Sequence, residues 1–291
     1  MPEPSPPESQ GTGTRRDVGC DLGFAVTEPS VLAFQVAVAT TAGTLLDERI
    51  TCTGAGGDAV AIREITGTLG GRTHVVSAPS GPLSFGYSAS IRTETMALAG
   101  DRADDSDALG LDAIVGLRQS RYCPSDALAG FAAAEFRDAA GAPADSVARM
   151  VASWVFERLT YALGSSGPSD TALDTLHSGA GVCRDFAHLT ITMCRALGVP
   201  ARLAAVYAPG LSPMDFHAVA EVRTVNGWEA LDPSRLAPRP VLVRIATGRD
   251  AADTAFATTV RGDVELVTSR VFASTDGDLP GDDHLHPVRI S

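Results

Sequence analysis

Residues 179–232 constrain the fold most, because a helical pattern is followed at once by three strand patterns. A loop of small residues, 179–182, precedes the helix, and Gly198 and Pro200 end it. The apolar positions spaced at about one helical turn are Phe186, Leu189, Met193 and Leu197. The strand patterns cover residues 201–207, 216–223 and 228–232. This order predicts one helix, then a strand, then a β-hairpin.

A cysteine, Cys183, lies where the loop turns into the helix. Peptide dipoles place roughly half a positive charge at a helix N-terminus, and the free N–H groups there stabilise a thiolate and later an oxyanion. A lone cysteine at such a position is more often structural than catalytic. A catalytic role therefore requires a base and an orienting group elsewhere in the chain. Asp185, in the first turn, is expected to favour the dipole or to cap the helix.

The two strands of the hairpin carry His217 and Asp232. A catalytic thiol needs a base to take its proton, and the base needs a group that fixes its tautomer and stabilises its imidazolium form. Cys183, His217 and Asp232 are therefore the predicted nucleophile, base and orienting carboxylate.

The register of the hairpin decides whether this triad can form. A tight turn centred on Asn226 and Gly227 would place Asp232 opposite Glu221, roughly 13 Å along the strand from His217. A looser loop over residues 223–226 would set His217 directly opposite Asp232, and both side chains share one face in either register. We predict the looser loop or a bulge.

Four segments together resemble the transglutaminase-like proteins of the papain-like cysteine enzyme superfamily, over roughly residues 161–250. They are Gly179-x-Gly-Val-Cys-Arg-Asp-Phe-Ala-His188, Arg195-Ala-Leu-Gly-Val-Pro-Ala-Arg202, Asp215-Phe-His-Ala218 and Gly227-Trp-Glu-Ala-Leu-Asp-Pro233. The resemblance implies a Cys-His-Asp triad with the cysteine at a helix N-terminus and the other two residues on an adjoining antiparallel sheet. The chain also resembles the bacterial subgroup that has a β-rich N-terminal region.

Three positions near these segments bear on the chemistry. Val219 stands where many relatives carry an aromatic residue, and Arg184 stands where a polar amide is frequent, which affects substrate preference more than the reaction. Tyr161 lies where relatives have an aromatic residue near the active site. Its hydroxyl is a candidate for the oxyanion hole, and a packed tyrosine is the alternative.

The first third of the chain has β character. Apolar residues alternate with small polar ones over residues 83–91, and glycine and proline clusters punctuate the region as in an antiparallel sandwich. The expected fold class is α+β, with an N-terminal antiparallel β-sandwich followed by a transglutaminase-like (papain-like) domain whose catalytic helix packs on an antiparallel sheet.

Two helices should connect these parts and cover the catalytic helix. Ser125 can cap a helix over residues 126–140, and Asp145 or Ser146 can cap the next. The expected organisation is a disordered tail over residues 1–16, a β-sandwich over 17–110, a catalytic domain over 111–275 and a C-terminal tail over 276–291, with the acidic stretch 101–112 leading out of the sandwich.

Composition excludes several classes of partner and location. The 291 residues, 44% hydrophobic, can fill two cores, and the formal net charge of −12 argues against nonspecific nucleic-acid binding. The chain contains no run of 18 or more apolar residues, so no membrane span and no membrane partner are expected. The start of the chain is polar and proline-rich, unlike a signal peptide. Five widely spaced cysteines, an odd number, favour the reducing cytoplasm.

Metal and nucleotide patterns are weak or missing, so no cofactor is expected. The chain has no Cys-x-x-Cys pair and no phosphate-binding Gly-x-x-x-x-Gly-Lys loop. The aspartates of residues 101–107 miss the calcium-loop spacing. Residues 282–286, Asp-Asp-His-Leu-His, could hold a metal only adventitiously, as unpaired ligands on a tail.

The predicted function is thiol-dependent amide or peptide bond hydrolysis, or acyl transfer, through a thioester on Cys183. Release of the acyl group by water gives a cysteine peptidase or amidase, a hydrolase that needs no second substrate pocket. Release by an amine gives a transglutaminase or amide synthase, an acyltransferase. A non-catalytic protein-binding module is the competing class. A protein or peptide is the expected substrate, and no oligomeric state is predicted.

Overall fold

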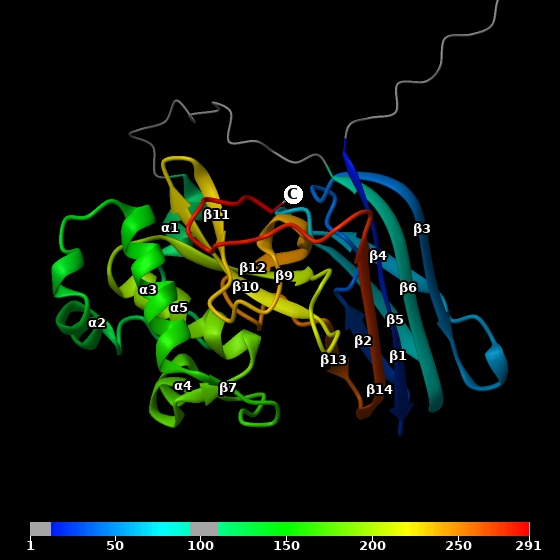
Figure 1. Ribbon diagram of the computed structural model, residues 1–291. Helices are drawn as coiled ribbons and strands as arrows, with labels where there is room; N and C mark the ends of the chain where they lie inside the picture. Colours follow the sequence, from blue (N-terminus) through cyan, green and yellow to red (C-terminus); the bar gives the residue numbers. More distant parts are fainter. Residues whose placement is uncertain (1–12, 94–109, 291) are drawn as a thin grey trace, which may run out of the picture.

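The computed structural model describes residues 13–93 and 110–290, and it shows an α+β chain with antiparallel sheets, as the sequence predicts (Figure 1). The strands of the sandwich lie at one side of the molecule and the helices lie at the other, with a separate four-stranded sheet between them. The sheet that positions the predicted triad lies between them.

Two four-stranded sheets form the sandwich. Their strand orders are β14-β1-β6-β3 and β13-β2-β5-β4. The strands are β1 (Thr14–Val26), β2 (Ser30–Phe34), β3 (Thr44–Thr53), β4 (Ile62–Thr66), β5 (Arg72–Ala78), β6 (Gly81–Thr93), β13 (Ala257–Arg261) and β14 (Val264–Thr275). A short 3₁₀ turn, Ala55–Gly57, joins β3 and β4. The alternation in β6 buries one set of its side chains, and Phe85 of that set stacks on Phe34 of the other sheet at 4.1 Å between ring centroids.

Two strands of the sandwich come from the C-terminal part of the chain. Strand β14 pairs antiparallel with β1, and β13 pairs with β2. Residues 257–275, which the sequence had placed with the catalytic domain, therefore complete the N-terminal sheets. The strand pattern of these residues identifies a strand but carries no information on which sheet receives it.

The expected tail over residues 1–16 differs from the structure at its end, because residues 14–16 already belong to β1. Residues 1–12 lie outside the described residues, as does most of the acidic stretch 101–112. Its last two residues begin helix α1 (Leu111–Gly116).

The sheet of the predicted catalytic unit has the strand order β11-β10-β9-β12. Its strands are β9 (Ala201–Tyr207), β10 (His217–Thr224), β11 (Gly227–Leu231) and β12 (Val243–Gly248). Helix α5 (Cys183–Ala196) packs on β10 and β9, with Phe186, Leu189 and Met193 fully buried. The helical spacing predicted the helix, but it did not predict that every residue from Asp185 to Arg195 is buried, because α5 is covered by helices as well as by the sheet.

Three further helices cover α5. They are α2 (Ala129–Glu135), α3 (Ala144–Arg158) and α4 (Ala172–Ser178). The helix expected over residues 126–140 is shorter than predicted, because Ser125 makes no side-chain cap and the chain continues after α2 as a 3₁₀ turn, Arg137–Ala139. A short parallel pair, β7 (Thr160–Tyr161) and β8 (Ala180–Gly181), places Tyr161 beside the loop before Cys183.

The C-terminal segment 276–290 packs on the catalytic sheet and is not a loose tail. The Asp282 carboxylate pairs with the guanidinium of Arg239, which lies in a 3₁₀ turn (Arg239–Val241), and the Ala230 N–H donates to the carbonyl of Val288. Ile290 is buried. Asp282 was expected to be an unpaired ligand, which is wrong because it pairs with Arg239. The described part of the chain contains no group of three metal-ligating side chains.

None of the helices within residues 13–93 and 110–290 is both long and apolar enough to span a membrane.

Candidate active site

Cys183 is the first residue of α5, and the chain before it is held in an extended conformation. Gly179 ends α4 in the left-handed region with φ of 69°, which lets the chain reverse toward β8. Val182 then enters the helix with extended backbone angles, and its N–H donates to the Asp185 carboxylate at 2.8 Å. The predicted role of Asp185 as a cap is confirmed. The Cys183 thiol is half-buried at the positive end of a fourteen-residue helix.

His217 and Asp232 form a buried ion pair beside this thiol. The Nε2 of His217 lies 2.9 Å from Oδ2 of Asp232, and both side chains are fully buried. The other ring nitrogen, Nδ1, is buried and has no hydrogen-bond partner among the described residues. The thiol of Cys183 lies close enough to raise the pKa of His217. The structure therefore brings together all three residues of the predicted triad.

The hairpin achieves this by a register that the sequence did not predict. Thr224 pairs with Gly227 and Ala220 with Leu231, so the turn is tight but centred on Val225 and Asn226. The predicted loose loop or bulge is wrong. In the observed register Asp232 is a diagonal neighbour of His217 on the same face, within reach of two long side chains.

Two hydrogen bonds from Ser234 fix the second oxygen of Asp232. The hydroxyl of Ser234 donates to Oδ1 at 2.6 Å and its N–H donates at 3.0 Å. Burial alone would raise the pKa of the Asp232 carboxyl, but the His217 imidazolium and these bonds hold it below its ordinary value. The Asp232 carboxylate is thus kept ionised inside the protein.

The negative charge of Asp232 in turn raises the pKa of His217. Burial opposes protonation of the imidazole, but the attraction of Asp232 and the contact with Cys183 outweigh it and raise the pKa of His217 to about 10. A base of this strength is suited to accept a proton from a neighbouring thiol.

The raised pKa of His217 predicts how the ion pair stabilises the fold. A folded-state pKa of about 10, above the ordinary 6.5, means that the contribution is complete below about pH 6.5 and is lost as the pH rises toward 10. We expect the difference in unfolding free energy between the native protein and His217→Gln to be largest at pH 6 and to shrink steadily at pH 8 and 10. Urea unfolding at these three pH values measures it, and a difference independent of pH would contradict the ion pair.

Tyr161 lies next to Cys183, as the resemblance implied. Burial and the nearby Cys183 thiol raise the pKa of the Tyr161 hydroxyl to about 12, while the backbone N–H of Cys183 acts in the opposite direction. The Tyr161 ring contacts Phe186 at 5.9 Å between centroids. The hydroxyl is therefore protonated at neutral pH and close to the N–H that begins α5.

A network that the sequence did not predict fastens the loop over residues 162–170 to the start of α5. Asp185 accepts hydrogen bonds from Ser166 and from the Nε of Arg184, and the Nη2 of Arg184 donates to the carbonyl of Gly167 at 2.9 Å. Arg184, which replaces the polar amide frequent in relatives, thus braces the loop beside Tyr161. The departure from the family pattern was visible in the sequence, but its partners were not.

The five cysteines differ in environment. All are free thiols, and Cys183 is half-buried while the other four are buried. Burial raises the pKa of Cys52 to about 11 and of Cys20, Cys123 and Cys194 to about 12. Only Cys183 combines access with a histidine partner.

Comparisons with known proteins agree with this geometry. The family model of the transglutaminase-like superfamily matches residues 131–233, which contain α5, β9, β10, β11 and all three triad positions. A crystal structure from Cytophaga hutchinsonii, described as a "putative cysteine protease", is similar at 31% identity with a TM-score of 0.81, covering 94% of this chain and 96% of that one. An uncharacterized protein of Mycobacterium leprae is 31% identical over 112 residues, which are 36% of this chain and 40% of that protein. The chain belongs to the transglutaminase-like superfamily of papain-like cysteine enzymes.

Proposed function

We propose that this protein is a cysteine peptidase or amidase that cleaves an amide bond of a protein or peptide through a thioester on Cys183. The observation that carries the proposal is the buried His217–Asp232 pair beside a half-buried thiol at a helix N-terminus. The similar Cytophaga hutchinsonii protein, described as a "putative cysteine protease", supports the same reaction class.

In the proposed mechanism, the Cys183 thiolate attacks the amide carbonyl while His217 holds the thiol proton. The tetrahedral oxyanion is stabilised by the Cys183 backbone N–H at the start of α5, with the Tyr161 hydroxyl as a second donor. His217 then gives its proton to the leaving amine, and the C–N bond breaks. Water, deprotonated by His217, attacks the thioester and releases the acid and the free thiol. Asp232 keeps the imidazole oriented throughout.

The pH dependence of thiol alkylation tests the first step. We expect iodoacetamide to label only Cys183 in the native protein, rapidly even at pH 6, because His217 holds the thiol proton below the ordinary thiol pKa of about 8.5. Peptide mass spectrometry, with the labelling rate followed from pH 5 to 9, measures this. In His217→Ala the fast labelling at pH 6 should disappear.

The matched control is His177→Ala, which removes an exposed histidine at the end of α4 and should leave the labelling profile unchanged. Ordinary thiol behaviour in both the native protein and His217→Ala would contradict the proposal and favour a binding module. Adding a primary amine during turnover of an ester substrate then separates hydrolysis from acyl transfer, because only an acyltransferase forms the amide product.

A further inference from the structure

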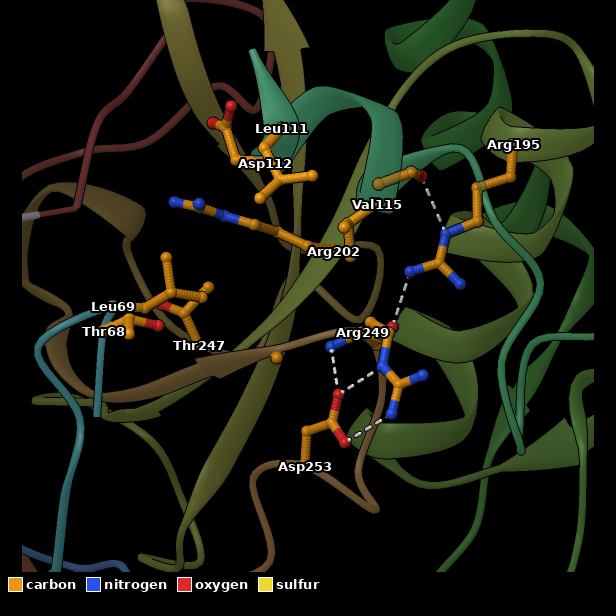
Figure 2. A pocket seen from close by; sticks show the side chains of 12 residues that line it. Thr68, Leu69, Leu111, Asp112, Val115, Arg195, Arg202, Thr247, Arg249 and Asp253 are labelled. Carbon is orange, nitrogen blue, oxygen red and sulfur yellow. Dashed lines mark hydrogen bonds and ion pairs between the residues drawn. The ribbon is translucent and has the colours of Figure 1, made fainter. Parts of the chain in front are cut away.

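A cavity of about 530 Å³ lies at the end of the catalytic sheet that is remote from Cys183 (Figure 2). It is bounded by the turn between β4 and β5, by α1, and by the ends of α5, β9 and β12. The side chains used below are Leu69, Leu111, Asp112, Val115, Arg202 and Asp253. Its volume lies in the range of small-molecule sites.

The cavity is separate from the proposed active site. Arg202 pairs across the strands with Glu221, which lies four residues, roughly 13 Å, along β10 from His217. Arg195, also in the cavity wall, lies twelve residues after Cys183, roughly 18 Å along α5.

Arg202, which lines the cavity, belongs to a charged group with more positive than negative charge. Glu221 is fully buried, and its two oxygens accept hydrogen bonds from Arg244 at 2.6 and 2.9 Å. The Nε of Arg202 donates to the same carboxylate at 2.8 Å. Two guanidinium groups therefore share one carboxylate, and one positive charge is left without a counter-charge in this group.

The guanidinium of Arg202 is held in place with its donors free. Its carbon Cζ lies 4.0 Å from the centroid of the Trp228 ring. Its two Nη atoms have no hydrogen-bond partner within residues 13–93 and 110–290. Figure 2 shows this side chain extending into the cavity toward the gap between Leu69 and Leu111. Burial lowers the pKa of Arg202, so its charged form lacks part of the solvation that an anion would replace.

The other charged side chains around the cavity have partners of their own, and the charge of Asp112 also acts on the pKa of Arg202. Arg249 pairs with Asp253 at 2.8 Å, and the Nε of Arg195 donates to the carbonyls of Gly116 and Ala201. The Asp112 carboxylate accepts the indole N–H of Trp228 at 2.8 Å. Because Asp112 and Asp253 add negative charge to the wall, the site suits a single negative charge better than a phosphate dianion.

The remaining wall is apolar and open to solvent. Leu69 and Leu111 are 46% and 74% exposed, and Val115 lies on the same helix as Leu111. We propose that the cavity binds a small hydrophobic monocarboxylate, with its carboxylate on the Nη atoms of Arg202 and its apolar body against Leu69, Leu111 and Val115.

Isothermal titration calorimetry with 4-phenylbutyrate on the full chain tests this site. The neutral analogue 4-phenylbutyramide and the dianion phenyl phosphate report on the head group. Arg202→Gln removes the anion partner, and Val115→Trp fills the cavity while keeping Arg202. Arg270→Gln, an exposed arginine on the sandwich strand β14, is the matched control. Circular dichroism confirms that each variant is folded.

We expect one molecule of 4-phenylbutyrate to bind per chain, at least tenfold more tightly than either analogue. Both cavity variants should weaken this binding at least tenfold, and Arg270→Gln should not change it. If one cavity variant fails to fold, the binding measured for the other variant still tests the proposal. The proposal is overturned if the native protein does not bind 4-phenylbutyrate, if it binds the amide equally well, or if a folded cavity variant binds as the native protein does. The readout is binding, so the outcome is independent of the reaction at Cys183.

Discussion

Asp232→Asn is expected to reduce kcat for hydrolysis of a p-nitrophenyl ester by roughly 10³- to 10⁴-fold. The amide is nearly the same size as the carboxylate, so the buried site keeps its shape. It has no charge to stabilise the imidazolium of His217, and it does not impose the tautomer that leaves Nδ1 facing Cys183. The pKa of His217 should fall with the loss of its counter-ion, and the alkylation rate of Cys183 at pH 6 should fall with it.

The matched control for this prediction is Asp215→Asn. Asp215 is an exposed carboxylate two residues before His217, and its charge reaches Tyr161. Its loss should change kcat by less than a few-fold, because among the described residues its carboxylate accepts a hydrogen bond from the N–H of Phe216 and makes none with the imidazole. Equal losses in the two variants would mean that general negative charge, and not the orientation of His217, supports the reaction.

Glu221→Gln is expected to lower the free energy of unfolding by about 3–5 kcal/mol. The carboxylate is fully buried between two guanidinium groups, so its neutralisation leaves the buried Arg244 and the half-buried Arg202 as neighbouring charges of the same sign. The two arginines hold the pKa of Glu221 below its ordinary value against the opposing effect of burial. Urea unfolding at pH 7, followed by circular dichroism, measures the change.

Glu229→Gln provides a comparison in the neighbouring strand. The Glu229 carboxylate is also buried, but its hydrogen-bond partners are the hydroxyl of Thr224 and the amide of Asn226. Replacing it should cost about 1 kcal/mol, the typical value of a neutral hydrogen bond. A loss as large as that in Glu221→Gln would show that burial of any carboxylate in this sheet, and not the arginine pair, sets the cost.

Local patterns in the sequence predicted the elements that carry the candidate site. The apolar spacing after Cys183 predicted α5, and β9 was predicted with the bounds that the structure has, Ala201–Tyr207. These signals are short-range, because helical and strand periods repeat within a few residues. The residue types at positions 183, 217 and 232 then predicted nucleophilic catalysis by a thiol, since few other residues can serve as nucleophile, base and orienting group.

Pairing between distant residues was beyond the reach of such patterns. The turn at Val225 and Asn226 shifted the hairpin away from both registers that the sequence suggested, although the face of Asp232 was right in each. Arg202, Glu221 and Arg244 lie on three neighbouring strands, and only the observed registers bring their charges together. Each is an ordinary charged residue in the sequence, and its burial results from packing alone.

The return of β14 to β1 also determines the order in which this protein can be built. Arg16 faces Thr275, so the sandwich closes only after residue 275 has left the ribosome, whereas every strand and helix of the catalytic sheet lies between residues 111 and 248. Contacts of such long sequence separation form slowly, because the loop that they close is long. During synthesis, β1 can pair with β6 on one side while its other edge waits for β14, and this open edge is exposed to wrong strand partners while the catalytic unit folds.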